Sequence, residues 1–283
     1  MAARGATLQL GGRLTVSRSA HRPGSVRLTA TFMRVGIMNE MQYRINFFLQ
    51  LLQSLLNVGT ALIVLAVVFS KTNDLDGWTR PQLLAVMGVF TLVGGIIRTF
   101  IQPNMERTVN EVREGKLDFA LTKPADAQLL ISIRDVRFWQ LTDVLVGLVV
   151  LTVALVQLES ITQWQDLLAF VVLLFSGLIS IYCFWLMLAS ASFWLVRINE
   201  VQELFDGLFR AGQYPVGIYP GWLRYGLTFV VPLAFAITVP SEAVTGQLAW
   251  QSVVVMIGFT AVLLVLSRWC WKRGLRRYGG ASA

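Results

Sequence analysis

Histidine and cysteine are nearly absent from this sequence, which has one histidine and two cysteines among 283 residues. A Ser/His/Asp triad, a zinc site or a histidine proton relay cannot be assembled around His21 alone. Cys183 lies in the middle of an apolar run and Cys270 lies at the end of another, so neither predicts a disulfide or a metal cluster. The sequence therefore predicts no catalytic residues and no metal site.

The nucleotide-binding loop Gly-x-x-x-x-Gly-Lys-Ser/Thr is also missing. We therefore expect no ATP hydrolysis by a P-loop in this chain, which we do not expect to be an enzyme or to bind a cofactor.

Charge is scarce, because 14% of the residues are charged while 55% are hydrophobic and the mean hydropathy is +0.62. Long runs with no charge, or with a single one, recur along the chain, and most exceed the ~20 residues that cross a bilayer as a helix. They do not alternate as the strands of a membrane barrel do. The pattern predicts an all-α polytopic membrane protein with six transmembrane helices, at about 46–70, 81–98, 138–158, 167–196, 200–218 or 223–239, and 243–267.

The net charge of +8 comes largely from the two ends of the chain. The first 44 residues contain seven arginines and one acid, and the tail from Arg268 contains five cations and no acid. The expected loops on the opposite side have few cations, namely Lys71 and Arg80 in one loop and none between Glu159 and Asp166. This positive-inside asymmetry predicts that both termini are cytosolic. It makes membrane lipid, rather than nucleic acid, the expected partner of the basic tail.

The N-terminal residues 1–27 are rich in Arg, Gly, Ser and Thr and lack the apolar core of a signal peptide. We expect them to form a loosely ordered cytosolic extension. Residues 28–44 mix apolar and polar side chains at helical spacing, which favours an interfacial helix before the first span. An overhang of the first span is the alternative. Residues 28–283 would then form one six-span domain.

A polar stripe follows the first expected span at intervals of four and three residues, which places its members on one face of a helix. Polar side chains are costly in hydrocarbon unless they have partners, so this face should avoid lipid. Two interpretations stay open, hydrogen bonds between helices and the lining of a substrate path. The stripe consists of Asn46, Gln50, Gln53, Asn57 and Thr60.

The segment from Arg98 to Arg137 has 13 charges in 40 residues and lies between two apolar runs. Residues 104–114 have a helical pattern with an apolar stripe, Gly115 supplies a stop, and a second amphipathic helix is expected from Asp126. Between the two helices, Leu117, Phe119 and Leu121 are expected to be exposed. We interpret the segment as a cytosolic docking surface for a partner, built on Met105, Val109, Val112, Glu114, Gly115, Leu117 and Phe119.

Two topologies fit the chain after the fourth span. In one, the amphipathic helix 199–217 stays in the cytosol and 223–239 crosses, which the distribution of cations favours. In the other, the amphipathic helix crosses with its charged face inside the assembly, and 220–240 enters and leaves on the outer side as a re-entrant segment. The charged face contains Glu203, Asp206 and Arg210, which the second topology makes candidate substrate-path residues.

Several strings, in this order and spacing, resemble the six-span permeases of type-2 ABC exporters, and in particular a small family of viologen or multidrug exporter permease components. They are Met41-Gln-Tyr-Arg-Ile-Asn-Phe, Glu114-Gly-Lys-Leu-Asp-Phe-Ala-Leu-Thr-Lys-Pro, Tyr214-Pro-Val-Gly-Ile-Tyr-Pro, Val231-Pro-Leu-Ala-Phe, Val239-Pro and Gly274-Leu-Arg-Arg-Tyr-Gly-Gly-Ala-Ser. The resemblance covers about residues 28–283.

The resemblance implies a dimer of twelve spans, made with a second copy or a paralogue, on two ATP-binding cassette subunits. It makes 104–123 the coupling helix region that docks on the ATPase, with 28–44 beside it, and it favours the re-entrant topology. Transport would follow alternating access in a bacterial inner membrane, with an internal membrane such as the thylakoid as an alternative. An uncharged polar path suits an amphiphile, a lipid or an aromatic cation. The rival functions are an ion-coupled secondary transporter or channel and a non-transporting membrane scaffold.

Overall fold

The computed structural model describes residues 44–72, 74–122, 126–158, 164–194 and 199–278, which are helical and contain no strand. The expected extension 1–27 and the expected interfacial helix, apart from its last residue, lie outside the described residues. Within the helices, the side chains of 44–45, 119–120 and 199–204 are not described either.

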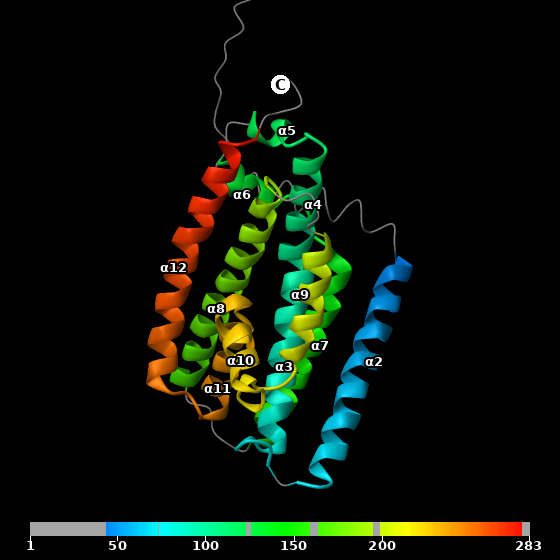
Figure 1. Ribbon diagram of the computed structural model, residues 1–283. Helices are drawn as coiled ribbons and strands as arrows, with labels where there is room; N and C mark the ends of the chain where they lie inside the picture. Colours follow the sequence, from blue (N-terminus) through cyan, green and yellow to red (C-terminus); the bar gives the residue numbers. More distant parts are fainter. Residues whose placement is uncertain (1–43, 73, 123–125, 159–163, 195–198, 279–283) are drawn as a thin grey trace, which may run out of the picture.

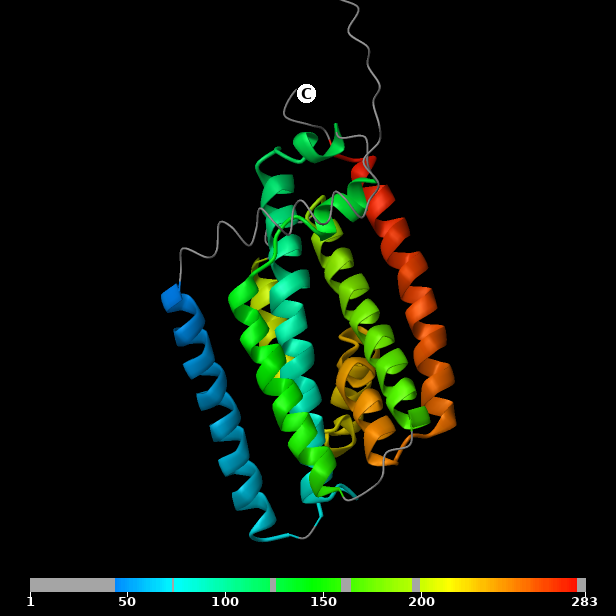
Figure 2. The ribbon, with the colours of Figure 1, turned by 180° about the vertical axis from the view of Figure 1, so that it is seen from behind.

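Five helices are long and apolar enough to cross a membrane, and they run side by side; consecutive ones alternate in direction except the last two, which run the same way (Figures 1 and 2). The loops after the first and the third of these helices are short, which places the helices that they join antiparallel to one another. The all-α polytopic fold is therefore confirmed. The five are α2 (Arg44–Phe69), α3 (Arg80–Ile96) with its extension, α7 (Leu141–Gln157), α8 (Trp164–Ala191) and α12 (Trp250–Leu275).

The second span extends beyond the bundle without a break. α3 continues through η1 (Ile97–Ile101), which is one π-helical turn, into α4 (Gln102–Arg113). The whole unit contains 34 residues. Because a helix rises 1.5 Å per residue, the unit is about 51 Å long, and it exceeds the roughly 30 Å hydrocarbon core of a bilayer.

Glycines allow α3 and α7 to approach each other closely. A Cβ added to Gly88 would lie 2.7 Å from the backbone nitrogen of Leu151, and one added to Gly95 would lie 2.7 Å from that of Val144. From α7, Gly147 meets the backbone of Leu92 in the same way. Small residues at such positions let helices in a membrane pack backbone against backbone. Gly88 and Gly95 therefore let the two spans pack closely.

The first span, α2, packs much more loosely. It contacts α7, α3 and the 3-10 turn η2 (Phe138–Gln140), and Figure 2 shows it at the edge of the bundle. Ser54 and Leu65 are buried, whereas Phe48 is 68% exposed and Ile63 is 66% exposed. Most of the surface of α2 is therefore available to lipid or to another protein.

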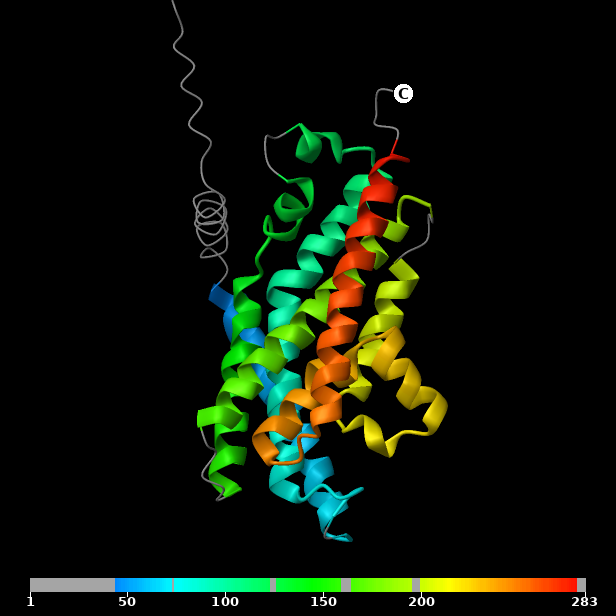
Figure 3. The same ribbon diagram turned by 90° about the vertical axis from the view of Figure 1, so that its left-hand side faces the viewer.

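The segment after the fourth span folds back on itself. α9 (Asn199–Ala211) and η3 (Val216–Ile218) lead along the bundle, and two short helical pieces bent by 77° follow (Figure 3). The first piece is α10 (Gly221–Tyr225) with η4 (Gly226–Val230), and the second is η5 (Ala234–Thr238) with α11 (Val239–Thr245).

Both ends of this folded-back segment lie at the turn between α2 and α3. A Cβ on Gly217 would lie 2.7 Å from a carboxylate oxygen of Asp76, and the Gln247 Nε2 donates to the carbonyl oxygen of Gly77 over 3.1 Å. The segment therefore enters and leaves at one end of the bundle, as the re-entrant topology requires. The single crossing by 223–239 that the cation distribution favours is wrong.

Close packing explains why this segment folds back, although the distribution of cations favours a single crossing. A Cβ on Gly177 of α8 would lie 2.5 Å from the Cα of Ala236, so the small residues of η5 rest directly on α8. Ala234, Phe235 and Ala236 are all buried. The break between the two helical pieces is thus covered by protein, which is the condition for irregular backbone at membrane depth.

The opposite end of the bundle carries the charged segment (Figure 1). Beyond α4 the chain forms the one-turn helix α5 (Asp118–Leu121) and the short helix α6 (Ala127–Ser132), and it returns to α7 through residues 133–137. We call the described residues 102–122 and 126–137, which include α4, α5, α6 and the linker 133–137, the platform. Both α8 and α12 end beside it.

Candidate functional site

The apolar stripe of α4 points into the protein rather than out of it. Met105 and Val109 are each 1% exposed, and Val112 packs partly buried against the same core. Leu117, which the sequence predicts to be exposed, is fully buried, so that expectation is wrong. Leu117 belongs to the hydrophobic core, against which Tyr278 packs, and the Tyr278 hydroxyl accepts a hydrogen bond from the Leu117 backbone N–H over 3.2 Å. These side chains support the platform from within.

The expected helix stop at Gly115 is confirmed. α4 ends at Arg113, and Gly115 has a φ of +68°, in the left-handed region that favours glycine. The N–H of Gly115 donates to the Val112 carbonyl over 3.3 Å, and that of Lys116 donates to the Glu111 carbonyl over 2.8 Å. This pair of bonds is the Schellman arrangement, which satisfies the last carbonyls of the helix. It turns the chain sharply into α5.

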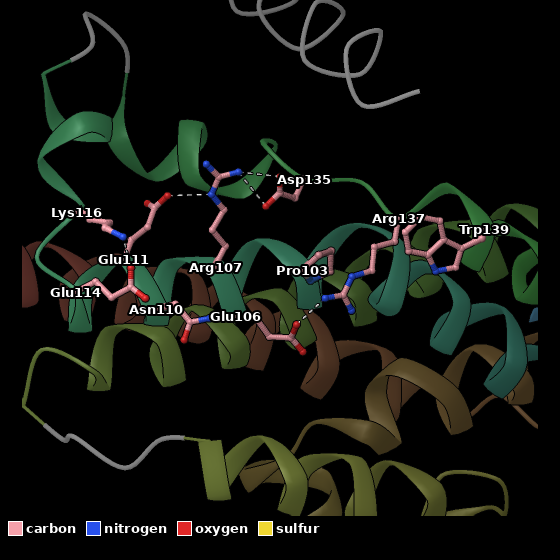
Figure 4. Close-up of a pocket in the computed structure, with 10 residues that line it drawn as sticks. All are labelled: Pro103, Glu106, Arg107, Asn110, Glu111, Glu114, Lys116, Asp135, Arg137 and Trp139. Atoms are coloured by element: carbon pink, nitrogen blue, oxygen red, sulfur yellow. Dashed lines mark hydrogen bonds and ion pairs between the residues drawn. The ribbon is translucent and has the colours of Figure 1, made fainter. Parts of the chain in front are cut away.

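Ion pairs lock the linker 133–137 onto the polar face of α4 (Figure 4). Arg137 pairs with Glu106 over 2.8 Å, and Arg107 pairs with Asp135 over 2.9 Å. Glu111 accepts from Arg134, whose side chain is 8% exposed, over 2.8 Å. Networks of charges hold geometry better than isolated surface pairs do. The platform is therefore a rigid extension of the second span.

Neutral hydrogen bonds add to this attachment. The Asn104 side chain donates to the Asp135 carbonyl over 2.6 Å, and its oxygen accepts from the Asp135 N–H over 2.9 Å. The Arg137 N–H donates to the Thr99 carbonyl inside the π-helical turn over 3.1 Å. An open groove of about 550 Å³ runs along this face and is lined by Pro103, Glu106, Arg107, Asn110, Glu111, Glu114, Lys116, Asp135, Arg137 and Trp139.

Glu114 and Lys116 are exposed charges between α4 and α5. They form an exposed ion pair over 2.7 Å. The hydrogen bond and the charge of Lys116 lower the pKa of Glu114, and the same interactions raise the pKa of Lys116. Leu121 in α5 is 37% exposed beside them. A partner approaching this end of the molecule would meet these side chains, whereas the side chain of Phe119 lies outside the described residues.

The platform is also clamped to the last span. Asp126 accepts hydrogen bonds from the backbone N–H groups of Gln128 and Leu129, which caps α6, and it pairs with Arg268 of α12 over 2.6 Å. The hydrogen bond from Arg268 is the main cause that lowers the pKa of Asp126. Tyr182 of α8 bonds to Gln128 over 3.2 Å. Movement of α6 must therefore involve α8 and α12.

A buried carboxylate connects the base of the platform with two spans. Arg98, in the π-helical turn, donates to Asp143 of α7 over 2.7 Å and 3.2 Å, and Asp143 is 3% exposed. The Gln50 Nε2 of α2 donates to the same carboxylate over 3.4 Å and to Gln140 over 3.2 Å. The sequence does not predict this contact. It offers one signal for the pair, a lone acid in one span and a cation at the end of the preceding span.

Among the described side chains, none of the expected substrate-path residues lines the groove of the platform. Of the stripe on α2, Gln50 alone reaches a neighbouring helix through a described hydrogen bond. The Thr60 hydroxyl donates to the Leu56 carbonyl of its own helix over 2.8 Å. The exposed members are Asn46, Gln53, Asn57 and Thr60.

On α9, Asp206 and Arg210 are exposed as well, and no ion pair joins them in the described part of the chain. The side chain of Glu203 is outside the described residues. The Asp206 and Arg210 side chains therefore lie on the outer surface of the described chain.

Comparison with known proteins identifies the family. A model of a family described as ABC-2 family transporter protein matches residues 55–282. Neither the curated proteins nor the solved structures include a significant match. The matched region contains most of α2, all the other helices and the platform. The chain therefore belongs to the ABC-2 transporter family, as a multi-pass membrane component of a transporter that works with ATP-binding subunits.

Proposed function

We propose that this chain is the permease subunit of an ATP-driven exporter and that the platform is its docking site for a separate ATPase. The supporting observation is that the charged segment between the second and third spans folds outside the bundle as one body held by ion pairs. ATP and magnesium are bound by two ATPase subunits, and no residue of this chain contacts either. A solvated loop with no partner would not require such a locked geometry.

The platform can transmit a push into the membrane. α4 continues α3 as one helical unit, so a force on α5 acts on the whole second span. The linker carries the same force to α7, and the Arg98–Asp143 pair joins the two helices at the base of the platform. Alternating access then follows if the ATPases bind the two arrangements of the permease with different free energies. Substrate binding must in turn change the affinity of the ATPases for nucleotide.

The docking end lies in the cytosol in this proposal, because the cations of the tail and of the platform are at this end. The host is a bacterial plasma membrane or an internal membrane such as the thylakoid. The re-entrant segment then opens to the outer side.

The exposed polar residues of α2 and α9 support a paired permease. Polar side chains of a span are costly when they face lipid. A second copy or a paralogue that covers Asn46, Gln53, Asn57, Asp206 and Arg210 would enclose them as the lining of a path. Uncharged amides with a few charges suit an amphiphilic substrate such as a lipid or an aromatic cation.

Docking is tested best at exposed positions, because Leu117→Asp would place a charge in the core and disturb the platform itself. The double variant Glu114→Lys/Lys116→Glu keeps the ion pair and the net charge but reverses the pattern that a partner meets. We expect it to reduce ATPase copurification and substrate-stimulated hydrolysis by about tenfold, since like charges at an interface are strongly unfavourable.

The matched control is Lys71→Glu/Asp74→Lys, which reverses two exposed charges at the opposite end of the bundle. It should leave copurification and hydrolysis unchanged. Normal coupling in the Glu114/Lys116 variant, or equal loss in both variants, would contradict the docking assignment.

A further inference from the structure

A second pocket lies at the end of α12, away from the groove of the platform. It measures about 260 Å³ and is lined by Trp194, Arg273, Arg276 and Arg277. The three arginines are exposed, and none forms an ion pair with a described residue. The charged residues of the platform, in contrast, are mostly paired with acids. Three neighbouring guanidinium groups around one hollow therefore leave their charge for a ligand.

The pocket is built by close packing between the ends of α8 and α12. Gly274 leaves room for the ring of Phe193, which any Cβ at that position would overlap. The Phe193 ring lies 5.7 Å from that of Trp271 and 6.0 Å from that of Tyr278, measured between centroids. Trp194 follows directly in the chain, so this packing holds it against the basic end of α12.

The tryptophans of α12 indicate the depth of the pocket. Trp250 and Trp269 are 75% and 55% exposed and lie 19 positions apart. At 1.5 Å per residue they are about 29 Å apart, close to the ~30 Å hydrocarbon thickness, and exposed tryptophans favour the membrane interface. The side chains between them that are exposed and aliphatic are Val254, Val255, Ile257, Val262, Leu264, Val265 and Leu266. α12 thus presents a lipid-facing surface that ends at Trp269.

The arginines follow immediately after this boundary. Arg273 is four positions beyond Trp269, which is one helical turn, and its guanidinium carbon lies 5.5 Å from the centre of the Trp269 ring. Arg276 and Arg277 follow within one further turn. On this spacing the Cα atoms of the three arginines lie about 6–12 Å beyond that of Trp269 along the helix axis, at the depth of the phospholipid headgroups.

We propose that this pocket binds the phosphate of an anionic phospholipid. A guanidinium presents a planar fork of donors that fits phosphate oxygens, and the ring of Trp194 covers the side of the headgroup. Basic pockets between helices at the membrane surface select anionic headgroups over neutral ones. Free inorganic phosphate shares the ligand chemistry but has no acyl chains to lie on the aliphatic surface of α12. The proposal does not depend on the ATPase-docking function.

The test uses the full-length protein, purified with its ATPase partner in neutral detergent. Thermal unfolding is followed while phosphatidylglycerol, phosphatidylcholine or inorganic phosphate is added. We expect phosphatidylglycerol alone to raise the Tm. Arg273→Gln should raise the half-saturating concentration of phosphatidylglycerol on the order of fivefold, which corresponds to ~1 kcal/mol per cation near a membrane surface. The triple variant Arg273→Gln/Arg276→Gln/Arg277→Gln should abolish the effect.

Lys272→Gln is the matched control, because it removes one exposed charge from the adjacent position without touching the pocket. It should change the half-saturating concentration by less than about twofold, as expected for a screened surface charge. Equal effects of Lys272→Gln and Arg273→Gln would contradict binding in the pocket and would show that the phospholipid binds a diffuse basic surface. Equal stabilisation by inorganic phosphate would overturn the lipid assignment. Loss of the ATPase from the arginine variants, with an unchanged response to lipid, would assign the arginines to a protein contact instead.

Discussion

The α3–α7 pair and the first span, α2, are attached to the same bundle by different physics. α3 and α7 meet through Gly88, Gly95 and Gly147, where backbone lies against backbone. α2 is largely exposed, and its polar contact with α7 is made by one glutamine, Gln50. Glycine contacts tolerate no displacement, whereas a long amide side chain can exchange partners. The comparison indicates a rigid unit that carries the platform and a first span that can shift beside it.

The largest expected effect comes from filling the glycine contact. Gly147→Leu forces a side chain into the backbone of Leu92 and should destabilise the protein by about 3 kcal/mol or more. Gly59→Leu in α2 is the matched control, because nothing lies within 4 Å of a Cβ there. Detergent-solubilised yield and thermal unfolding measure both variants. Similar unfolding temperatures would show that the α3–α7 contact is not tight.

The buried carboxylate gives the next largest effect. Asp143→Leu leaves Arg98 without its partner and should cost about 2 kcal/mol, below the 3–5 kcal/mol of a fully buried pair because the Arg98 side chain is 37% exposed. The double variant Arg98→Met/Asp143→Leu should recover part of this loss, because no charge is then left unpaired. Thermal unfolding of the four proteins forms a double-mutant cycle. Strict additivity would contradict a direct interaction between the two residues.

The attachment of α2 should depend on Gln50 and not on the rest of the stripe. Gln50→Ala removes bonds to Gln140 and Asp143 and should cost about 1 kcal/mol. Gln53→Ala, three positions on, removes an exposed side chain and should stay within about 0.5 kcal/mol of the parent. Unfolding in detergent measures both variants. Equal losses would mean that the stripe as a whole holds α2 to the bundle.

The smallest expected effect concerns the exposed clamp between α6 and α12. The pKa of Asp126 is lowered in the folded protein, so its stabilisation is present above its unfolded value of about 3.8 and is lost as pH falls through the folded value. As an exposed pair with Arg268 it contributes about 0.2–1 kcal/mol. The Tm difference between the parent and Asp126→Asn should therefore shrink between pH 6 and about pH 3. A difference that is constant with pH would rule out this ion pair as the cause.

The sequence predicts well the features that depend on local pattern. The lengths of the apolar runs identify the long spans, and Gly115 marks the end of α4. The burial of Leu117 could not be predicted, because Tyr278, which contacts it, is 161 positions away in the chain. The Arg98–Asp143 pair joins two spans and leaves no periodicity in either.

The re-entrant segment was open to two interpretations for a related reason. Counting cations weighs charge alone, whereas the fold is decided by the close approach of Gly177 to Ala236, a tertiary contact. The candidate path residues of α2 and α9 stay predictions, because Asn46, Gln53, Asn57, Thr60, Asp206 and Arg210 lie on the outer surface of the described chain.

The docking of the platform on an ATPase is tested most directly by photo-cross-linking in the native membrane. A photoreactive residue is placed at Lys116 or, as the control, at Lys71 on the other end of the bundle, with the ATP-binding subunit coexpressed. The account predicts a cross-link from position 116 to that subunit, with a yield that changes when ATP is bound, and none from position 71. A cross-link from position 71, or none from position 116 in a complex that still hydrolyses ATP on addition of substrate, would contradict it.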